Sequence, residues 1–206
     1  MVFANRNEAG MLLADKLAKY NNAVNTIVLG VPRGGVPVAD CVAQQLNLPL
    51  DVILSKKIGH PFNKEFAIGA VTENLIFVEK GADVDEDYIQ SETQRIRKQL
   101  AVRNQLFRKH KPPLIFKNKT IILVDDGIAT GNTLLILVQM MRQAGVSKIV
   151  IASPVVPSDR VNVIERSCDE FVYLHAPEYF EGVGAFYDDF TQVEDEDVVR
   201  ILEKAK

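Results

Sequence analysis

The sequence of 206 residues predicts an α/β fold built on a largely parallel sheet. Short apolar runs alternate with segments of helical periodicity along most of the chain, which is the pattern of strand–helix–strand units. The central runs are apolar throughout, so both faces of the sheet are expected to be covered. With 47% hydrophobic residues, the chain is long enough to bury one substantial core.

The first half of the chain is expected to begin with a helix and to supply two core strands. Asn7 is a candidate N-cap for a helix that runs to about Tyr20, with Leu12, Leu13 and Leu17 facing inward. The elements that follow are a strand over 26–31, a glycine-containing turn over 32–37, a helix over 38–46, a strand over 51–54 and a polar loop over 56–65.

The second half continues the alternation of strands and helices. Its expected elements are short strands over 67–71 and 75–78, a long polar helix over 85–110, strands over 121–124, 148–152 and 170–174, helices over 134–141 and 158–166, and a closing helix from residue 191. The repeated order of strand and helix favours one doubly covered sheet.

The long polar helix has a narrow apolar stripe, which is typical of a helix that packs at a surface or against a partner subunit. The stripe consists of Ile89, Ile96, Leu100 and Phe107. The basic residues of this helix are interspersed with acids, and the net charge of the chain is −3, so we expect a solvated or dimer-contact face and no nucleic-acid partner. These basic residues are Arg95, Arg97, Lys98, Arg103, Arg108 and Lys109. A homodimer is expected.

The cysteines and the N-terminal segment indicate the cellular compartment that the sequence predicts. Cys41 and Cys168 form no metal-binding pattern and are expected to be buried free thiols. His110 and His175 are expected to be structural. No signal peptide is visible, and no segment approaches the roughly 20 apolar residues that span a bilayer. The sequence predicts a cytoplasmic protein without a membrane partner.

The segment 121–133, IILVDDGIATGNT, carries most of the functional information. An apolar strand ends in Asp125 and Asp126, and a turn of small and hydroxyl residues leads into a helix. Unpaired amides and the helix dipole favour a phosphate at such a turn. Gly127 and Gly131 allow close approach of the backbone, while Thr130 and Thr133 add hydroxyl donors. The two carboxylates can accept hydrogen bonds from a sugar diol, so the segment predicts a holder for a ribose 5-phosphate.

This segment resembles the phosphoribosyl pyrophosphate (PRPP) signature of type I phosphoribosyltransferases. The resemblance implies that the PRPP-binding residues are Asp125, Asp126, Gly127, Ile128, Ala129, Thr130, Gly131, Asn132 and Thr133. It also implies the type I phosphoribosyltransferase fold: a Rossmann-like parallel sheet of about five strands flanked by helices, with a small hood. Residues 1–206 then form a single domain, with a core over about 26–174 and a hood from the N-terminal segment and about 175–206.

A second segment, Val31-Pro32-Arg33-Gly34-Gly35, follows the first core strand. It is similar to the pyrophosphate loop of xanthine-guanine phosphoribosyltransferases, with proline in place of serine. In that family such a loop often contains a strained non-proline peptide bond. The resemblance implies that Arg33, Gly34 and Gly35 bind pyrophosphate, and a guanidinium suits phosphate oxygens.

The segment from Lys56 resembles the start of the flexible catalytic loop of adenine and orotate phosphoribosyltransferases. A mobile basic loop can neutralise departing pyrophosphate and exclude water. Lys57 is the first candidate for this role and Lys56 the second. Because the family often has a lysine where His60 stands, the identity of the loop cation stays open, and Lys64 is a further candidate.

Aromatic residues gather near the C-terminus, where they can provide a stacking surface for a planar base or close the hood. By a loose similarity to hypoxanthine-guanine phosphoribosyltransferases, Phe171 or Val172 is expected to contact the acceptor base, and Glu178 to be the matching acid.

Together these resemblances imply a Mg²⁺-dependent transferase of nucleotide salvage that moves the phosphoribosyl group of PRPP to a nitrogenous acceptor. A purine-like base is favoured. The catalytic candidates are Asp125, Asp126, Lys57 and Arg33, and Mg²⁺ is expected to bind mainly through PRPP and water, with no metal-ligating side chains. Two alternatives stay open: a PRPP-sensing regulator of the same fold without transferase activity, and a plain nucleotide-binding module.

Overall fold

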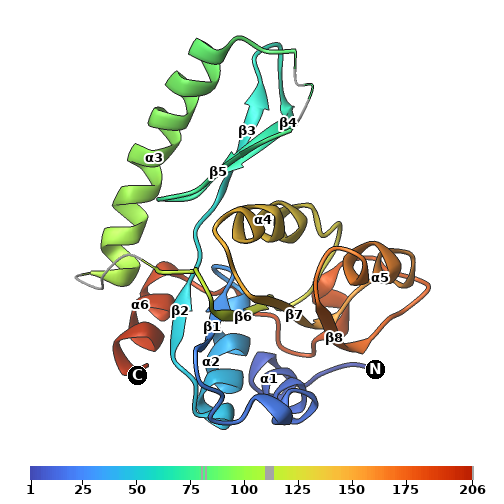
Figure 1. Cartoon of the computed structure of the whole chain (residues 1–206). Helices are drawn as coiled ribbons and strands as arrows, with labels where there is room; N and C mark the ends of the chain where they lie inside the picture. Colours follow the sequence, from blue (N-terminus) through green and yellow to red (C-terminus); the bar gives the residue numbers. More distant parts are fainter. Residues whose placement is uncertain (80, 82, 110–113, 206) are drawn as a thin grey trace.

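The central sheet of the computed structural model, which describes residues 1–79, 81, 83–109 and 114–205, has five parallel strands in the order β2-β1-β6-β7-β8 (Figure 1). These strands are β1 (Thr26–Gly30), β2 (Leu50–Val52), β6 (Thr120–Val124), β7 (Lys148–Val155) and β8 (Glu170–His175). From β1 the chain passes to one side for β2 and then to the other for β6. The crevice at the carboxyl ends of β1 and β6 is therefore the topological switch point. The predicted fold class is confirmed.

Helices cover both faces of this sheet (Figure 1). The helices of one face are α1 (Arg6–Lys16) and α2 (Gly35–Leu46), and those of the other are α4 (Asn132–Gln143) and α5 (Ser158–Glu165). Alternate side chains of β6 enter the two cores. Ile122 and Val124 pack on the α1–α2 side, and Ile121 and Leu123 pack on the α4–α5 side. Burial on both faces explains why the strand is apolar throughout.

A second, antiparallel sheet and a long helix extend away from the main sheet as an arm (Figure 1). The arm consists of β3 (Lys56–His60), β4 (Asn63–Val71), β5 (Ile76–Val78) and α3 (Glu86–Arg108). The prediction of a polar loop over 56–65 is wrong, because this segment forms most of the β3–β4 hairpin. Ile58 is fully buried between polar neighbours, and its partner strand follows later in the chain, so local composition concealed the strand.

Helix α3 buries the predicted apolar stripe, with Ile96, Leu100 and Phe107 in the core and Ile89 partly buried against it. Arg108 differs from the prediction of a solvated face. Its guanidinium is buried and binds the Asp51 carboxylate of β2, with Nε 2.9 Å from Oδ1 and Nη2 3.1 Å from Oδ2. A buried carboxylate requires such a partner. His110 lies outside the described residues.

Several predicted boundaries shift in the structure. The N-cap of α1 is Asn5, not Asn7, because the Asn5 side chain accepts hydrogen bonds from the amides of Asn7 and Glu8. A 3₁₀ turn over Ala18–Tyr20 follows α1, and Leu12 is exposed rather than inward. Helix α2 begins at Gly35 and not at residue 38, and α6 (Asp195–Lys204) begins after the predicted residue 191.

The N-terminal segment meets the segment around residues 186–190 beside the carboxyl ends of the central strands. The Phe3 amide donates to the carbonyl of Phe186 at 2.9 Å, and the Asp188 amide donates to the carbonyl of Phe3 at 2.8 Å. The rings of Phe3 and Tyr187 pack with centroids 5.4 Å apart. These contacts join the N-terminal segment to residues 175–206, the two segments for which we keep the name hood.

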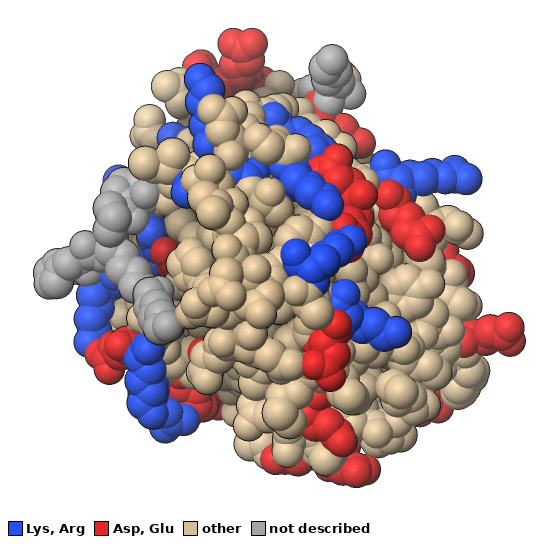
Figure 2. Space-filling model, turned by 60° about the horizontal axis from the view of Figure 1, so that its bottom comes forward, with Lys and Arg blue, Asp and Glu red and all other residues tan. Residues whose placement is uncertain are grey.

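The remaining sequence predictions concern the surface charges, the cysteines, His175 and membrane-spanning helices. Basic and acidic side chains lie interspersed on the face shown in Figure 2. Cys41 and Cys168 are free thiols that are partly buried rather than fully so. The His175 ring packs edge-on against Phe186. None of the helices in the described part of the chain is long and apolar enough to cross a membrane.

Candidate active site

Two adjacent carboxylates stand at the switch point, directly after β6. The Asp125 side chain accepts the amide of Asp126 at 3.0 Å, which fixes one carboxylate against the backbone of the other. Asp126 is buried and Asp125 partly so. The register that pairs Gly30 with Val124 sets the loops after β1 and β6 side by side. The pair therefore faces the crevice where ligands of open α/β sheets bind.

The loop after the pair leads into α4 with an open backbone. Gly131, the N-cap, has φ +76°, a conformation that favours glycine, and it offers no side chain to cap the helix. The Asn132 amide makes one long hydrogen bond, of 3.4 Å, to the Thr130 hydroxyl. The Ile128 amide donates to the carbonyl of Val155 at 2.9 Å and ties the loop to β7. The helix N-terminus and the Thr133 side chain lie beside the cleft described below. This arrangement suits a phosphate.

The loop after β1 presses against the acidic pair. Its Pro32–Arg33 peptide bond is cis. A Cβ atom added to Gly34 would overlap the Asp126 carboxylate, and one added to Gly35 would lie 2.7 Å from the carbonyl oxygen of Val124. Both positions therefore require glycine for close approach rather than for a positive φ. The two segments singled out in the sequence are in direct contact.

Arg33 points from this loop toward the start of α6. Its Nη1 lies 3.0 Å from Glu194 Oε2 and 3.6 Å from Asp195 Oδ1. Asp195 Oδ1 also lies 2.9 Å from Nη2 of Arg103, which comes from α3. Two guanidinium groups from separate elements thus meet the same carboxylate.

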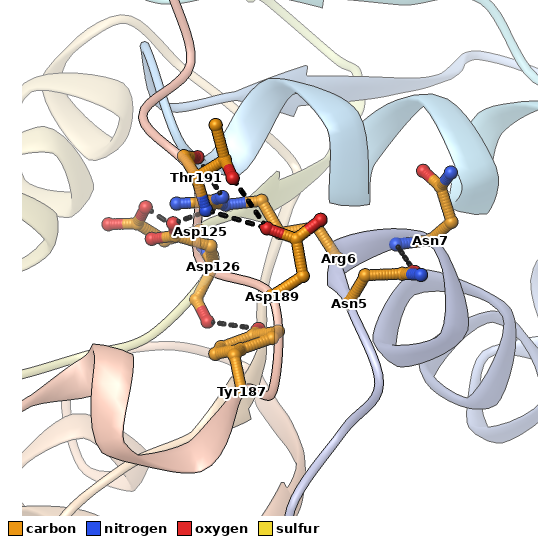
Figure 3. A network of polar contacts seen from close by, with 8 residues as sticks. All are labelled: Asn5, Arg6, Asn7, Asp125, Asp126, Tyr187, Asp189 and Thr191. Carbon is orange, nitrogen blue, oxygen red and sulfur yellow. Dashed lines mark hydrogen bonds and ion pairs between the residues drawn. The ribbon is translucent and has the colours of Figure 1, made fainter.

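Figure 3 shows how the hood fixes the acidic pair from the opposite side. Arg6 Nε donates to Asp126 Oδ2 at 2.8 Å, and Arg6 Nη1 donates to the carbonyl of Thr191 at 2.9 Å. The Tyr187 hydroxyl donates to the carbonyl oxygen of Asp126 at 2.6 Å. The guanidinium of Arg6 also lies 3.9 Å from the centre of the Phe190 ring. Arg6 therefore holds the carboxylate of Asp126, and Tyr187 holds the backbone of the same residue.

The surroundings of the pair shift its titration. Burial, together with the charge of Asp126, raises the pKa of Asp125 well above its ordinary value. Burial also raises the pKa of Asp126, although the Arg6 guanidinium opposes that effect. Burial raises the pKa of the Tyr187 hydroxyl, which keeps it a hydrogen-bond donor at neutral pH. Without a ligand, these two aspartates therefore bind a proton at a higher pH than ordinary aspartates do.

A cleft of about 880 Å³ unites these groups. Four cations and two carboxylates line it, and two of the cations, Arg33 and Arg103, are paired with Glu194 and Asp195 at the start of α6. Guanidinium and ammonium groups in a cleft suit a phosphorylated ligand. The predicted site residues on its wall are Arg33, Gly34, Lys56, Asp125, Asp126 and Thr133. The polar and aromatic wall residues that the sequence analysis did not assign to the site are Arg6, Ser55, Gln99, Arg103, Phe190 and Gln192.

The predicted loop cations separate in the structure. Lys56 lines the cleft and donates to the Gln99 side chain at 2.8 Å. Lys57 lines a neighbouring groove beside Lys64, and Lys64 Nζ contacts the Tyr88 hydroxyl at 2.6 Å. His60 packs near Phe66 at the far end of the hairpin. Of the four candidates, Lys56 is the one placed on the cleft wall.

The predicted acceptor residues lie apart from the acidic pair. Phe171 and Val172 are partly buried within β8 at the sheet edge, where the Phe171 ring packs on Tyr173 with centroids 5.0 Å apart. Glu178 is exposed beyond the end of that strand. The cleft wall contains none of these three side chains, and its aromatic residue is Phe190.

Arg6 and Arg103 are the cleft residues that sequence reasoning missed. Arg6 is a lone basic residue next to a helix cap, outside any motif, and Arg103 is one of several basic residues on a polar helix. Neither has a local signal. Arg103 lies one helical turn beyond Gln99 and on the same side of the helix as Leu100, and all three line the cleft. The sequence could have assigned Arg103 to the cleft only if the orientation of α3 against the main sheet had been known.

Comparisons with known proteins identify the family to which the chain belongs. The family model of the phosphoribosyl transferase domain matches residues 3–187. The chain is 37% identical over 209 aligned positions to "Putative phosphoribosyl transferase Rv0571c" of Mycobacterium tuberculosis (strain ATCC 25618 / H37Rv), covering 99% of this chain and 47% of that protein. It thus spans about half the length of this curated relative. The crystal structure of TT1426 from Thermus thermophilus superposes with a TM-score of 0.89 at 40% identity, covering 100% of both chains. The chain belongs to the phosphoribosyl transferase domain family.

Proposed function

We propose that the protein transfers the 5-phosphoribosyl group of PRPP to a nitrogenous acceptor and releases pyrophosphate. One observation carries the proposal: an acidic pair, an open helix N-terminus and an Arg-Gly-Gly loop converge on one cleft at the switch point. Each group matches one part of PRPP in charge and hydrogen-bonding character.

The loop over 127–133 holds the 5-phosphate in this proposal. Backbone amides of the loop and the start of α4 donate to the phosphate oxygens, and the Thr130 and Thr133 hydroxyls add donors. Asp125 and Asp126 accept hydrogen bonds from the ribose hydroxyls. Those bonds favour the ionised carboxylates, so ligand binding lowers the raised pKa values of the pair.

The reaction breaks the bond between ribose C1′ and the pyrophosphate oxygen and forms a bond from C1′ to a nitrogen of the acceptor. Positive charge builds on the ribose ring, beside the two carboxylates. Negative charge builds on the departing pyrophosphate, where Arg33 and Lys56 are placed to neutralise it. Lys57 remains a candidate for the same role from the neighbouring groove.

Mg²⁺ belongs to this proposal as an ion bound mainly through PRPP and water. The pair supplies two carboxylates, and one oxygen of Asp126 is already bound to Arg6. Within the described residues, no group of three or more His, Cys, Asp and Glu side chains is arranged to hold a metal. One or two carboxylates plus substrate phosphates are the usual protein environment of Mg²⁺, so the residues fit. When bound, the ion neutralises charge on the leaving group.

The acceptor and the assembly are the finer parts of the proposal. A purine-like base is favoured by the similarity of the Arg33-Gly34-Gly35 segment to the pyrophosphate loop of xanthine-guanine phosphoribosyltransferases. The Phe190 ring on the cleft wall is already packed against Arg6 and Tyr187, so it gives no separate support for a base. A homodimer formed through α3 is supported by the exposed apolar side chains of Val102 and Leu106 on that helix.

Calorimetric titration of PRPP, with and without Mg²⁺, tests the proposal. We expect Mg²⁺-dependent binding to the wild-type protein and a loss of at least about tenfold in affinity for Asp125→Asn/Asp126→Asn, because hydrogen bonds to charged groups contribute about 1.5–3 kcal/mol each. The control is Asp159→Asn, which removes an exposed carboxylate of α5 and should bind normally.

A pyrophosphate-release assay with a panel of bases then separates an enzyme from a sensor. Release with a purine-like base supports the transferase. Tight PRPP binding without release for any acceptor would assign the protein as a PRPP sensor. Absence of PRPP binding by the folded wild-type protein would overturn the proposal.

A further inference from the structure

Two arginines that reach the cleft from different elements converge on one oxygen atom. Asp195 Oδ1 lies 2.9 Å from Arg103 Nη2 and 3.6 Å from Arg33 Nη1. Glu194 Oε2 lies 3.0 Å from the same nitrogen of Arg33. The sequence pointed to Arg33 as a pyrophosphate-binding residue, whereas Arg103 belongs to the arm helix α3. The structure gives the two side chains a common partner.

The two carboxylates of this cluster have different duties. Glu194 is the N-cap of α6 and takes part in a capping box with Asp197, and Gln192 donates to its Oε1 at 2.7 Å. These contacts fix Glu194 as part of the helix start. Asp195 is the first residue of the helix, and its carboxylate is placed between the two arginines. A substitution of Asp195 should therefore disturb the fold less than a substitution of Glu194.

Guanidinium groups that converge in this way have the geometry and charge to bind a diphosphate. Each presents a fork of N–H donors that matches phosphate oxygens, and a diphosphate has more oxygens and more charge than a carboxylate. Arg33 and Arg103 both line the cleft that contains the acidic pair. Carboxylate oxygens thus occupy positions that phosphate oxygens could take.

Exposure makes such an exchange feasible. The side chains of Arg33 and Arg103 are 32% and 47% exposed, and those of Glu194 and Asp195 are 52% and 29% exposed. Ion pairs at this exposure contribute only about 0.2–1 kcal/mol, so a diphosphate can replace them at little energetic cost.

We propose that Arg103 binds the pyrophosphate group of the substrate together with Arg33, and that Asp195 and Glu194 hold both guanidinium groups until that group arrives. This inference rests on the proposed function. It places one substrate-binding residue on the arm and makes α6 a competitor for the leaving-group site. Binding of the diphosphate then releases the contact between Arg103 of α3 and Asp195 of α6.

The proposal predicts effects of opposite sign for the two partners of one ion pair. Arg103→Gln removes a donor to the diphosphate and should weaken binding by about tenfold, the lower end for hydrogen bonds to a charged group. Asp195→Asn removes the competing charge and should tighten binding by about two- to fivefold, the value of an exposed pair. A merely structural ion pair would lower affinity, or leave it unchanged, in both variants.

Titration calorimetry with inorganic pyrophosphate and with PRPP, each with Mg²⁺, measures these effects, and ribose 5-phosphate serves as a ligand that lacks the diphosphate. Its affinity should be the same in wild type and both variants. Arg142→Gln is the matched control for Arg103, because it removes a partly exposed guanidinium that is also paired with a carboxylate but is not among the residues that line the cleft. Glu196→Gln is the control for Asp195, since it removes an exposed charge from the same helical turn.

The outcomes separate this inference from the function on which it rests. Unchanged pyrophosphate affinity in Arg103→Gln, with PRPP bound normally by the wild type, overturns the role of Arg103 and leaves the proposed function intact. Weaker binding in Asp195→Asn overturns the competition by α6. A folded wild-type protein that binds neither PRPP nor pyrophosphate overturns both proposals.

Discussion

The two ends of the cleft contain ion pairs of different character. At the acidic end, Arg6 and Asp126 are 2.8 Å apart and their side chains are only 11% and 12% exposed. At the basic end, the Arg103–Asp195 pair has a similar length of 2.9 Å, but its side chains are 47% and 29% exposed. The two ion pairs therefore have similar lengths but differ in their exposure to solvent. The acidic end is a buried part of the fold, whereas the basic end is exposed enough to exchange partners as we propose.

The difference has a direct energetic basis. Removing one partner from a buried pair leaves a charge that is neither solvated nor neutralised, which costs about 3–5 kcal/mol. Water stabilises both partners of an exposed pair when they separate, so such a pair contributes about 1 kcal/mol or less. The carboxylates of the acidic pair can thus stay oriented before any ligand arrives, while the arginines remain available.

The largest expected effect is on Arg6→Ala. This change leaves the Asp126 carboxylate buried without its cation and also removes the contact with the carbonyl of Thr191. We expect the free energy of unfolding to fall by about 3 kcal/mol at neutral pH, measured by urea denaturation. PRPP affinity should fall as well, because Asp126 loses its orientation.

Arg142→Ala is the matched control for that experiment. Arg142 lies 2.8 Å from Asp169, the same length as the Arg6 pair, but the side chains are 36% and 35% exposed. Its loss should lower stability by less than about 1 kcal/mol. Equal losses in the two variants would contradict the distinction between the fixed and exchangeable ends.

The next effect is that of Gly34→Ala, which probes how closely the two loops meet. The added methyl group would overlap the Asp126 carboxylate, and that carboxylate is held in place by Arg6. We expect a loss of about 2 kcal/mol in unfolding free energy, as for an overpacked core. Asp126→Ala removes the group that the added methyl would overlap. In a double-mutant cycle, the double variant should therefore lose less unfolding free energy than the sum of the two single losses. A Gly34→Ala variant as stable as wild type would show that the loops can separate.

The contrast between the two ends also explains what the sequence could predict. The acidic pair and the loop over 127–133 are contiguous, and their strand–turn–helix order implies their geometry. The fold class and the family were predicted from that segment and are confirmed. The loop over 32–35 could be expected at the same edge because parallel strands present their carboxyl ends at one edge of the sheet, and the structure shows that the two strands are neighbours.

The remaining parts of the site depend on contacts between distant segments. Arg6 meets Asp126 across 120 positions, and Arg103 meets Asp195 across 92. No local pattern encodes such pairs, because they depend on how the chain ends and the arm dock. The β3–β4 hairpin escaped prediction for the same reason, since its polar strands are specified by pairing rather than by composition.

A smaller effect is expected from Asp125→Asn, and it should depend on pH. Because the pKa of Asp125 is raised in the folded protein, the native state binds more protons than the unfolded state above the ordinary value of 3.8. The contribution of Asp125 to stability is thus present below that pH and is lost as pH rises through the raised pKa. Asparagine keeps the acceptor for the Asp126 amide without the charge. The variant should be about 1 kcal/mol more stable than wild type at pH 7 and equal to it near pH 4.

Urea denaturation of both proteins across this range measures the difference. The exposed Asp159→Asn variant should show no such trend. A difference that stays constant with pH would mean that the carboxylate of Asp125 is not the group responsible.

The smallest expected effect is on the stability of Asp195→Asn. The change breaks the contacts to Arg33 and Arg103, but both arginines remain exposed enough to be solvated. It also removes one of three acids from the first turn of α6, where a negative charge contributes about 0.3–1 kcal/mol. We expect the unfolding free energy to fall by about 0.5 kcal/mol, close to the loss in the Glu196→Gln control. A loss near that of Arg6→Ala would mean that the basic end is as fixed as the acidic end, and the arginines would then be unable to exchange a carboxylate for a phosphate.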